Sequence, residues 1–441
     1  MVRVHGLQIL GIESKTAFTS VFLVVNPFIW YYAVIIFLQN TLRSLSLNNT
    51  DSALVWGVHF SGIIFAALAG ASLTKRIDKR RFLTFWMIFG VISSLVLSAI
   101  STSVPVIVLV ALVLGVSLGL GMPACMTYYT ECVPVEKRGR ISGVVMLITG
   151  VGLFIFGIFP FTSPIMLGIV LGVWRLSSVL VFHLSKPSKE AKEEKREDSS
   201  YKTILGQQSF VLYLIPWIML SLVNYLGSPT QVDIVGRDTV AFMSIIRNLM
   251  MGVFAIIGGF LLDFVGRKRI AISGFVMLGI DAATLGLFPS SVWANYFSAT
   301  VDGIALGFLL VIFIVTIWGD LSNGKSSSKY YAIGVLPFFV SKLLELTIGK
   351  DISLFIVQYA GGTNGLFSFL AFYLFLAILP LVYAPETLPE KLMKDRDLKS
   401  YTEKALKQAQ KDAGKSQKKD SDEAEESPED EEARKLAEKY Y

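Results

Sequence analysis

The chain has few cysteines and few histidines, and this narrows the chemistry that it can perform. Only 2 of its 441 residues are cysteines, and Cys125 and Cys132 lie on one predicted helix, where they cannot reach each other. Two thiols and 3 histidines offer no metal cluster, and the sequence has no recognisable Ser-His-Asp set or phosphate-binding loop. We therefore predict no enzyme activity, no metal and no cofactor.

Charged residues are also scarce. They make up 17% of the chain against 53% hydrophobic residues, and the mean hydropathy is +0.59, whereas a soluble protein carries about 25% charge. Apolar runs of about 20 residues, the length with which a helix crosses a bilayer, alternate with short basic loops. Because the runs are continuous, they indicate membrane helices. We attribute the net charge of +6 to membrane topology and not to nucleic-acid binding. We expect no cleavable signal sequence, because the first residues are too polar for one.

We predict an all-α integral membrane protein with twelve transmembrane helices. The chain would divide into an N-terminal six-helix bundle (1–185), a cytoplasmic linker (186–208), a C-terminal six-helix bundle (209–386) and a charged tail (387–441). The predicted spans are residues 16–40, 51–73, 82–101, 104–129, 141–161, 164–184, 209–228, 239–263, 270–289, 291–318, 330–350 and 363–384.

The distribution of Lys and Arg predicts the orientation. The loops at 75–81, 136–140 and 266–269, the linker and the tail are basic, whereas the opposite loops have almost no Lys or Arg. The positive-inside rule therefore places both termini in the cytoplasm, and we expect the plasma membrane. The tail contains separate basic and acidic blocks, which lack the apolar surface needed to fold. We expect a solvated tail without folded structure, and a regulatory or docking role is the alternative.

Two loops carry recognisable motifs. The loop after the eighth span reads GGFLLDFVGRKR, and the end of the fourth span reads YYTECVPVEKRGR. The first resembles the best-known loop motif of the major facilitator superfamily, G-x-L-x-D-x-x-G-R-K. The second matches Y-x-x-E-x-x-P-x-x-x-R-G-R of its sugar-porter-like, metabolite:proton symporter branch, and Pro385-Glu386-Thr387 resembles the end of that branch. The resemblance covers all twelve spans and implies a 6+6 pseudo-repeat around a central cavity.

By the same resemblance, these loops would form a cytoplasmic gate. We expect Asp263 to meet the N-terminus of the fifth span near Gly139, where a helix dipole favours an anion by about 0.3–1 kcal/mol. Arg138 and Arg267 would complete a charge network with Asp263 and Glu131. The alternative is that these charges only keep the loops in the cytoplasm. The predicted gate residues are Glu131, Arg138, Arg140, Gly259, Asp263, Gly266, Arg267 and Asp320.

Each of the two motifs has a weaker copy in the other half of the chain. In ASLTKRIDKRR, after the second span, Lys75 stands where the later loop has Asp263, and Asp320 in the tenth span is a faint counterpart of Glu131. A Lys facing Lys329, at the start of the eleventh span, would repel rather than clamp. We therefore predict an asymmetric gate whose stronger side contains Asp263.

Ionisable residues inside spans are functional candidates, because their burial is costly. Arg247, Asp302, Lys342 and Glu345 lie on helices that the resemblance places around the cavity. Arg247 has no acid one turn away and is a candidate clamp for a carboxylate or phosphate; otherwise it pairs with Asp302 or Glu345. Lys342 and Glu345 share one helical face. They are either a self-neutralising pair or a pair that responds to protons or substrate.

Three further polar residues are weaker candidates. Arg175 and Asp281 lie on helices that the resemblance places outside the cavity, so we expect structural roles. His59 is a candidate for coupling, although a packed polar residue is the alternative.

Proline interrupts the first span near its middle. Pro27 kinks a helix and frees a carbonyl, and broken helices at this depth often mark transporter sites. Asn26 and Trp30 are therefore predicted to contact substrate, and Asn224 and Tyr225 occupy a similar depth in the seventh span.

These features predict a secondary active transporter that works by alternating access. The predicted substrate is a small polar metabolite, an organic anion held by Arg247 and Lys342, with proton coupling left open. A sugar or drug carrier is the alternative within the superfamily, although the first span lacks an acid and the seventh lacks the hexose pattern. A non-transporting receptor or assembly subunit with the same fold is the alternative of another class. We expect a monomer in the lipid bilayer.

Overall fold

Every regular element of the computed structural model is a helix. The structure describes residues 15–74, 76–100, 103–158, 163–185, 199–324, 326–388 and 428–440, and no strand occurs among them. Contacts divide the chain into two units, Met1–Thr387 and Leu388–Tyr441, at a boundary next to the predicted start of the tail. The all-α fold class predicted from the apolar runs is confirmed.

The first half of the chain contains α2 (Lys15–Ser44), α3 (Asn49–Leu73), α4 (Lys79–Val96), the 3-10 turn η1 (Leu97–Ala99), α5 (Val104–Cys132), α6 (Val135–Ile158) and α7 (Pro164–Leu184). The short helix α8 (Tyr201–Leu205) follows. The second half contains α9 (Gln208–Val223), α10 (Gly227–Val235), α11 (Arg237–Phe264), α12 (Arg267–Leu287), α13 (Val292–Leu310), η2 (Val311–Thr316), α14 (Ile317–Leu321), α15 (Ser327–Gly334), α16 (Leu336–Thr347), α17 (Gly349–Tyr359), α18 (Thr363–Leu376) and α19 (Ile378–Tyr383).

Eleven of the predicted spans coincide with helices in the described part of the chain that are long and apolar enough to cross a membrane. The seventh differs. Instead of 209–228, α9 ends at Val223 after 16 residues, and α10 begins at Gly227. Pro229 has no N–H to donate to the carbonyl of Tyr225, so a continuous helix through this stretch would lack a bond. The apolar run therefore breaks into two helices.

The tenth span contains a wide helical turn. Residues Val311–Thr316 form the π-helical segment η2 between α13 and α14. Two side chains stabilise this turn: Thr316 Oγ1 donates to the Val311 carbonyl at 2.8 Å, and Trp318 Nε1 donates to the Phe313 carbonyl at 2.6 Å. Such turns insert one extra residue per turn and often occur at functional sites. Here the segment immediately precedes Asp320.

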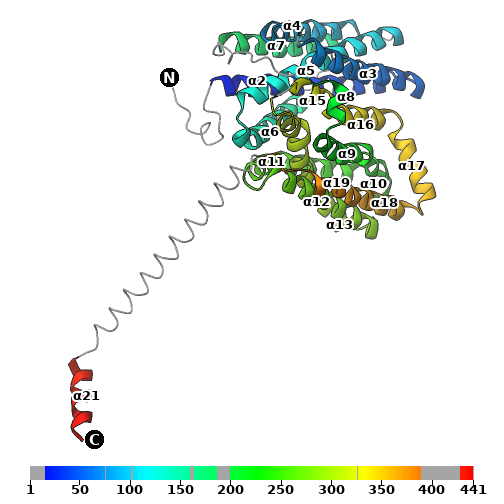
Figure 1. Cartoon of the computed structure of the whole chain (residues 1–441). Helices are drawn as coiled ribbons and strands as arrows, with labels where there is room; N and C mark the ends of the chain where they lie inside the picture. Colours follow the sequence, from blue (N-terminus) through cyan, green and yellow to red (C-terminus); the bar gives the residue numbers. More distant parts are fainter. Residues whose placement is uncertain are drawn as a thin grey trace. The chain divides into compact units, whose positions relative to one another are not determined.

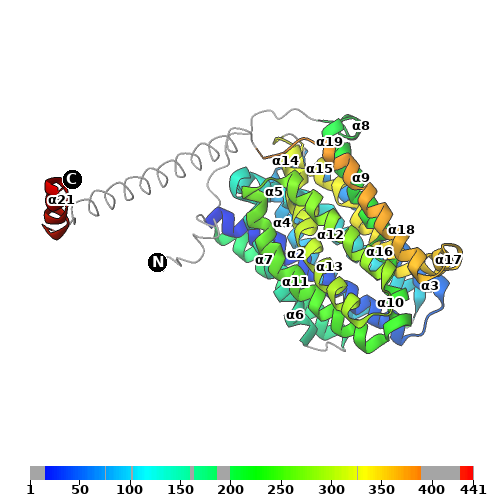
Figure 2. The ribbon, with the colours of Figure 1, turned by 90° about the horizontal axis from the view of Figure 1, so that it is seen from below.

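Helices from the same half of the chain lie together. In the first half α3 packs on α5 and α4 on α7, and in the second α11 packs on α13 and α12 on α18. Figure 1 shows the blue to blue-green helices as one layer and the green to orange helices as another. The halves meet where α6 packs on α11 and where α3 packs on α15 and α16. In Figure 2, α8, α14, α15 and α19 lie at one end of the helices, and α10 and α17 lie at the other.

The outer surface of this unit carries large apolar side chains. Phe65 and Phe154 are each 71% exposed, and Phe372 is 67% exposed. Soluble monomers rarely expose apolar patches on this scale. These side chains lie on helices that are long and apolar enough to cross a bilayer, which takes about 20 residues, so we assign this surface to lipid contact.

The described part of the tail differs from the expected lack of structure. Residues Pro428–Tyr440 form α21, whose side chains at 431–439 are exposed. Glu431 and Lys435 pair at 3.1 Å along this helix, and acids near its start with bases near its end suit the helix dipole. Residues 389–427, which include the basic block, lie outside the described residues.

Candidate functional site

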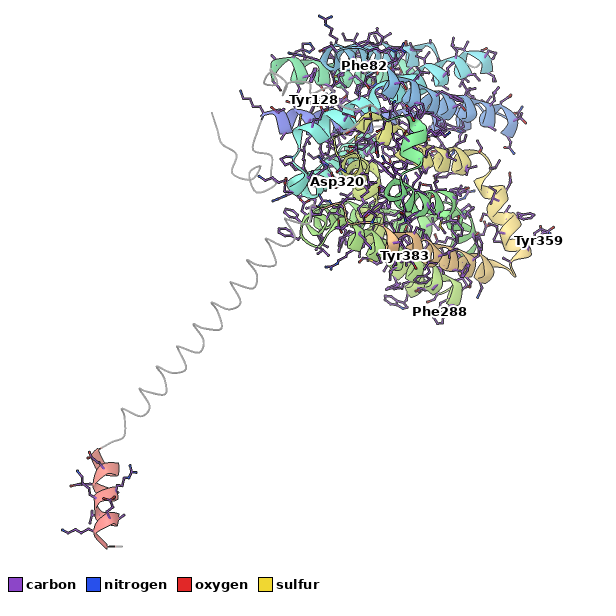
Figure 3. The ribbon with its side chains drawn as sticks, in the orientation of Figure 1. Phe82, Tyr128, Phe288, Asp320, Tyr359 and Tyr383 are labelled. Carbon is purple, nitrogen blue, oxygen red and sulfur yellow. The ribbon has the colours of Figure 1, made fainter. Side chains whose placement is uncertain are left out.

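Asp320 lies between two arginines that come from different halves of the chain. Arg138 on α6 donates from Nη1 to Asp320 Oδ1, and Arg267 on α12 donates from Nε to Asp320 Oδ2 at 3.0 Å. The side chains of Asp320 and Arg267 are fully buried, and that of Arg138 is 6% exposed. Figure 3 shows Asp320 between the two layers of helices. Each carboxylate oxygen thus has a charged donor, which a buried acid requires.

A second carboxylate extends this network. Asp263, at the end of α11, accepts from the Gly139 N–H at 2.8 Å and from the Arg140 N–H at 3.0 Å, both near the start of α6. Arg267 Nη2 lies 3.3 Å from Asp263 Oδ1 and donates to the Val135 carbonyl at 2.6 Å. Asp263 therefore lies at the helix start where the sequence placed it. We call Arg138, Gly139, Arg140, Asp263, Arg267 and Asp320 the Asp320 cluster.

Glycines allow α6 and α11 to approach closely enough for these bonds. A Cβ atom at Gly139 would lie 2.6 Å from both Asp263 Oδ1 and the Gly259 carbonyl oxygen. A Cβ at Gly259 would likewise lie 2.6 Å from the Gly139 carbonyl oxygen. Real Cβ atoms essentially never come this close to another heavy atom. Any larger residue at either position would move the helices apart and lengthen the bonds to Asp263.

Glu131 has a different partner from the one expected. Its carboxylate accepts from Lys79 Nζ at 2.8 and 2.7 Å, so the described contact stays within the first half of the chain. Arg138, predicted to join Glu131, instead reaches Asp320 while donating to the Thr130 carbonyl at 2.8 Å. The described contacts thus join Arg138 and Arg267 to Asp320, and the place of Glu131 in the network stays a prediction. Asp320 takes the central position because the wide turn η2 ends directly before α14.

The start of α12 is closed by a carboxylate that the sequence analysis did not assign to the site. Gly266 has a positive φ of 110°, a conformation that glycine adopts without strain. The next two N–H groups, those of Arg267 and Lys268, donate to Glu386 at 2.9 and 3.2 Å. Glu386 belongs to the P-E-T string, but its partner lies 119 residues away in sequence. Sequence spacing gives no signal for such a contact.

A second contact between the halves lies where α3 meets α15. Thr74 Oγ1 is 3.3 Å from Ser328 Oγ, and Ser328 Oγ donates to the Ala71 carbonyl at 3.4 Å. Lys75 lies outside the described residues. Lys329, which was expected to face it, donates from Nζ to the Ser199 carbonyl at 3.0 Å. The described contact thus contains hydroxyl groups where the Asp320 cluster contains carboxylates.

The linker takes part in this second contact. The Tyr201 hydroxyl donates to the Leu68 carbonyl on α3 at 2.6 Å, and Lys329 Nζ lies 5.3 Å from the centre of the Tyr201 ring. The Ser199 N–H also donates to Ser326 Oγ at 3.1 Å. Residues at the start of α8 therefore bridge α3 of the first half and α15 of the second. We call Ser199, Tyr201, Ser326 and Lys329 the linker contact.

A pocket lies between the two halves. Its lining is apolar and aromatic except for three hydroxyl groups, and it contains no charged side chain. Most of the lining residues come from α2, α5 and α6 of the first half and from α16 and the segment η2 of the second half. The lining residues are Phe28, Tyr31, Tyr32, Leu118, Met122, Met146, Thr149, Leu310, Ile314, Val335, Phe338 and Phe339.

Asn26 and Trp30, predicted to contact substrate, lie instead in the core of the first half. Asn26 Nδ2 donates to the Trp174 carbonyl at 2.7 Å, and its Oδ1 accepts from Arg175 at 3.0 Å. Trp30 Nε1 donates to Ser94 Oγ at 2.7 Å. Both are buried and neither lines the pocket. Of α2, it is Phe28, Tyr31 and Tyr32 that line the pocket, so a role of Asn26 and Trp30 in substrate contact stays a prediction.

Arg175 organises that core, as its expected structural role requires. Its guanidinium lies 4.6 Å from the centre of the Trp86 ring and 5.7 Å from that of the Trp30 ring. Cation–π contacts of this kind stabilise a charge without a carboxylate. His59 is also a packed residue: it is fully buried between α3 and α5, and its Nδ1 lies 2.8 Å from the Ala111 carbonyl. Neither residue lines the pocket.

Four further predicted residues form two ion pairs. Arg247 Nη1 lies 3.5 Å from Asp302 Oδ2, so Arg247 pairs as its alternative interpretation stated. Lys342 Nζ lies 2.5 Å from Glu345 Oε2 on α16. None of these four lines the pocket. Lys342 follows the pocket residue Phe338 by one helical turn and so shares its face of α16.

Asn224 and Tyr225 lie at the break after α9. Asn224 Oδ1 accepts from Ser341 Oγ at 3.0 Å, which joins this break to α16. Tyr225 is 7% exposed and packs beside Gly349, where an added Cβ would lie 2.9 Å from its ring. Asn224 therefore contacts α16 and Tyr225 contacts the start of α17, and neither residue lines the pocket.

Comparison with known proteins agrees with this architecture. Residues 19–230 match the family model of the Major Facilitator Superfamily. The fold is similar to that of the proton:xylose symporter XylE bound to 6-bromo-6-deoxy-D-glucose, with a TM-score of 0.66 and 15% sequence identity over 85% of this chain and 96% of that one. It is also similar to the human organic anion transporter MFSD10 (TETRAN), with a TM-score of 0.58 and 12% identity over 83% of this chain and 98% of that one.

No curated protein sequence matches the chain. At these low identities the two solved structures show a shared fold alone. The sequence match nevertheless covers the first half of the chain, and the fold match extends through both halves. Residues 19–230 therefore match the Major Facilitator Superfamily, and both halves of the chain share the fold of a solved structure from that superfamily.

Proposed function

We propose that the protein is a secondary active transporter that carries a small organic solute by alternating access. The observation that carries this proposal is the Asp320 cluster. It joins α6 of the first half to α11, α12 and α14 of the second through buried charges, and the pocket lies between the same halves. Transporters of this kind move one bundle against the other around such a site.

The proposed orientation follows from the basic loops. The Asp320 cluster includes residues of the loops at 136–140 and 266–269, which the positive-inside rule assigns to the cytoplasm. The described conformation would then be closed toward the cytoplasm, and opening toward it would break the contacts of Asp263 and Asp320. We also propose the plasma membrane and a monomer as the working unit.

We propose an organic anion as the solute, with Lys342 rather than Arg247 as its cation. Both cations are paired, Arg247 with Asp302 and Lys342 with Glu345, but Lys342 lies one turn from the pocket residue Phe338 on the same face of α16. Glu345 lies seven residues after Phe338, two helical turns further along the same face of α16. The Lys342–Glu345 pair would therefore lie at the pocket's edge.

Proton coupling would follow from competition for Lys342. A solute carboxylate can replace Glu345 on Lys342 if a proton neutralises Glu345 as the solute binds. The two similar structures support this proposal in part, because one is named an organic anion transporter and the other a proton symporter. A sugar would need more polar groups than the pocket offers, and a neutral drug would not use Lys342.

Transport by the purified protein in liposomes tests the proposal. Labelled phenylacetate, succinate and xylose serve as probes, with and without an imposed pH gradient. We expect an anion to be taken up, with uptake raised by an inward proton gradient. Glu345→Gln should remove the effect of the gradient. Glu431→Gln, which alters an exposed acid–base pair on α21, is the matched control and should change nothing.

Deletion of residues 391–441 separates a transporter from a receptor. A transporter should keep its uptake without the tail, because the Asp320 cluster and the pocket lie before residue 388. If the intact protein moves none of the three probes while the deletion abolishes a cellular response, the receptor interpretation replaces the transporter.

A further inference from the structure

The pocket between the halves has a chemistry that restricts its ligand, and the inference below rests on the proposed transport function. Its walls are mainly phenylalanine, tyrosine, methionine and branched aliphatic side chains. The hydroxyl of Thr149 is already occupied, because it donates to the Val145 carbonyl at 2.8 Å. A polyhydroxylated solute would leave most of its hydrogen-bonding groups unpaired here, and each such group weakens binding severely.

Tyr31 provides one unoccupied polar group. The residue is 3% exposed, and its hydroxyl has no hydrogen-bond partner among the residues that the structure describes. A buried hydroxyl without a partner is unfavourable, so this oxygen is a position where a ligand group gains a bond without losing an existing one. The ring of Tyr31 is held edge-on against Phe339, with ring centres 5.8 Å apart, and against Tyr32 at 5.3 Å.

The pocket is small in this conformation, and its lining can adjust to a ligand. Its free volume in this conformation is about 30 Å³, the room of about two water molecules. A solute larger than this requires the lining side chains or the helices to move. Met122 and Met146 line the pocket, and methionine side chains adjust their shape readily and make favourable contacts with aromatic rings. Phe28 and Phe338 add aromatic faces.

We infer that the solute is an aromatic carboxylate whose ring carries a hydrogen-bonding group. The ring lies among Phe28, Met122, Met146 and Phe338, and its polar substituent meets the Tyr31 hydroxyl. The carboxylate meets Lys342, which is about 6 Å along α16 from Phe338 at 1.5 Å per residue. A small aromatic acid has this length, with its apolar body and its charge at opposite ends.

Binding of matched ligands to the full-length protein in detergent tests the inference. The probes are 4-hydroxyphenylacetate, phenylacetate, cyclohexylacetate and xylose, measured by isothermal titration calorimetry. We expect 4-hydroxyphenylacetate to bind roughly three- to tenfold more tightly than phenylacetate, the effect of one additional neutral hydrogen bond. Phenylacetate should in turn bind more tightly than cyclohexylacetate, and xylose should not bind.

Variants locate these preferences. Tyr31→Phe should make 4-hydroxyphenylacetate bind no more tightly than phenylacetate, whereas a purely structural role of Tyr31 would weaken the binding of both ligands alike. Phe338→Leu should remove the advantage of the aromatic ring over cyclohexylacetate. Thr84→Val is the matched control, because the Thr84 hydroxyl also donates to a carbonyl of its own helix, that of Arg80 at 2.9 Å, but lies outside the pocket, and it should keep both preferences.

Two results would overturn the inference. One is binding of xylose or succinate as tight as that of the aromatic acids. The other is a preference for 4-hydroxyphenylacetate that survives in Tyr31→Phe. Either result leaves the proposed transport function intact. Alternating access is tested separately, by measuring the distance between the two halves with and without Asp320→Asn, which needs no ligand. If Asp320→Asn leaves that distance unchanged, the proposed function itself is wrong.

Discussion

The two contacts between the halves use the same helix-to-helix arrangement with different chemistry. At the Asp320 cluster, two buried carboxylates accept from arginines and from the start of α6. At the contact of α3 with α15, Thr74 and Ser328 meet through hydroxyls at 3.3 Å. There the linker adds Tyr201, which donates to Leu68 at 2.6 Å. The sequence has Lys75 at the position equivalent to Asp263.

This difference indicates how two repeated halves can keep equivalent helix contacts while the side chains that form those contacts diverge. The position of Asp263 needs an anion to match a helix start, and Lys75 cannot supply one. On that side, the described bonds come from neutral groups and from Lys329, which turns to the linker carbonyl of Ser199. We therefore expect the charged contact to control opening and the linker contact to have a smaller, modulating effect.

The largest expected effect is that of Asp320→Asn. The substitution leaves Arg138 and Arg267 buried with reduced charge compensation, and breaking a buried pair from one side costs about 3–5 kcal/mol. Uptake by the purified variant in liposomes should fall at least about tenfold, since 1.4 kcal/mol corresponds to a factor of ten. Size-exclusion chromatography checks that the variant is folded. Wild-type uptake in a folded variant would show that the cluster does not control transport.

A smaller loss is expected for Asp263→Asn. An asparagine oxygen can still accept one of the two α6 N–H bonds, but the charge that faces Arg267 and the helix start is lost, an effect of up to about 2 kcal/mol. Uptake should fall several-fold, and less than in Asp320→Asn. Asp351→Asn on α17 is the control, because it changes an acid in the first turn of a helix outside the cluster. The reverse order of the two cluster variants would contradict the proposed ranking.

Tyr201→Phe should have a still smaller effect. It removes one neutral hydrogen bond, from the tyrosine hydroxyl to the Leu68 carbonyl, worth about 0.5–1.5 kcal/mol, and it leaves the ring beside Lys329. We expect uptake to change about two- to threefold under the same conditions. A loss as large as that of Asp320→Asn would mean that the linker contact, and not the charged one, dominates the gate.

The smallest effect is expected for Glu131→Gln. Lys79, the described partner of Glu131, lies in the same half of the chain, and both side chains are about one-quarter exposed. Pairs of this exposure contribute about 0–1 kcal/mol. Uptake and thermal stability should therefore remain near those of the wild type. A severe loss of uptake would restore Glu131 to the gate network in which the sequence placed it.

The sequence predicted the helices and the position of Asp263 because both depend on local chemistry. Continuous apolar runs specify spans, and a glycine at 139 or 259 with a nearby acid specifies a close crossing. The break after α9 was missed because Pro229 lies within an apolar run and hydropathy does not register its missing N–H. The sequence analysis underestimated the role of Asp320 because the sequence does not show the wide turn η2, which directly precedes the helix of Asp320.

The pocket was not predictable in the same way. The helix α2 is apolar on all sides, so hydrophobic periodicity does not indicate which face meets the pocket. Sequence reasoning chose Asn26 and Trp30 because they lie beside the interruption at Pro27, but Arg175, more than 140 residues away in sequence, holds Asn26 in the core. Phe28 and Tyr31, which line the pocket, gave no stronger signal than other aromatic residues of the spans.

A distance measurement across the charged contact tests the central claim most directly. Spin labels at Glu136→Cys on α6 and Arg269→Cys on α12, in a background with Cys125 and Cys132 replaced by Ser, report the separation of the halves by pulsed electron paramagnetic resonance. The account predicts one short, narrow distance distribution for this protein in lipid nanodiscs and a second, longer population after Asp320→Asn. Identical distributions with and without Asp320 would contradict it.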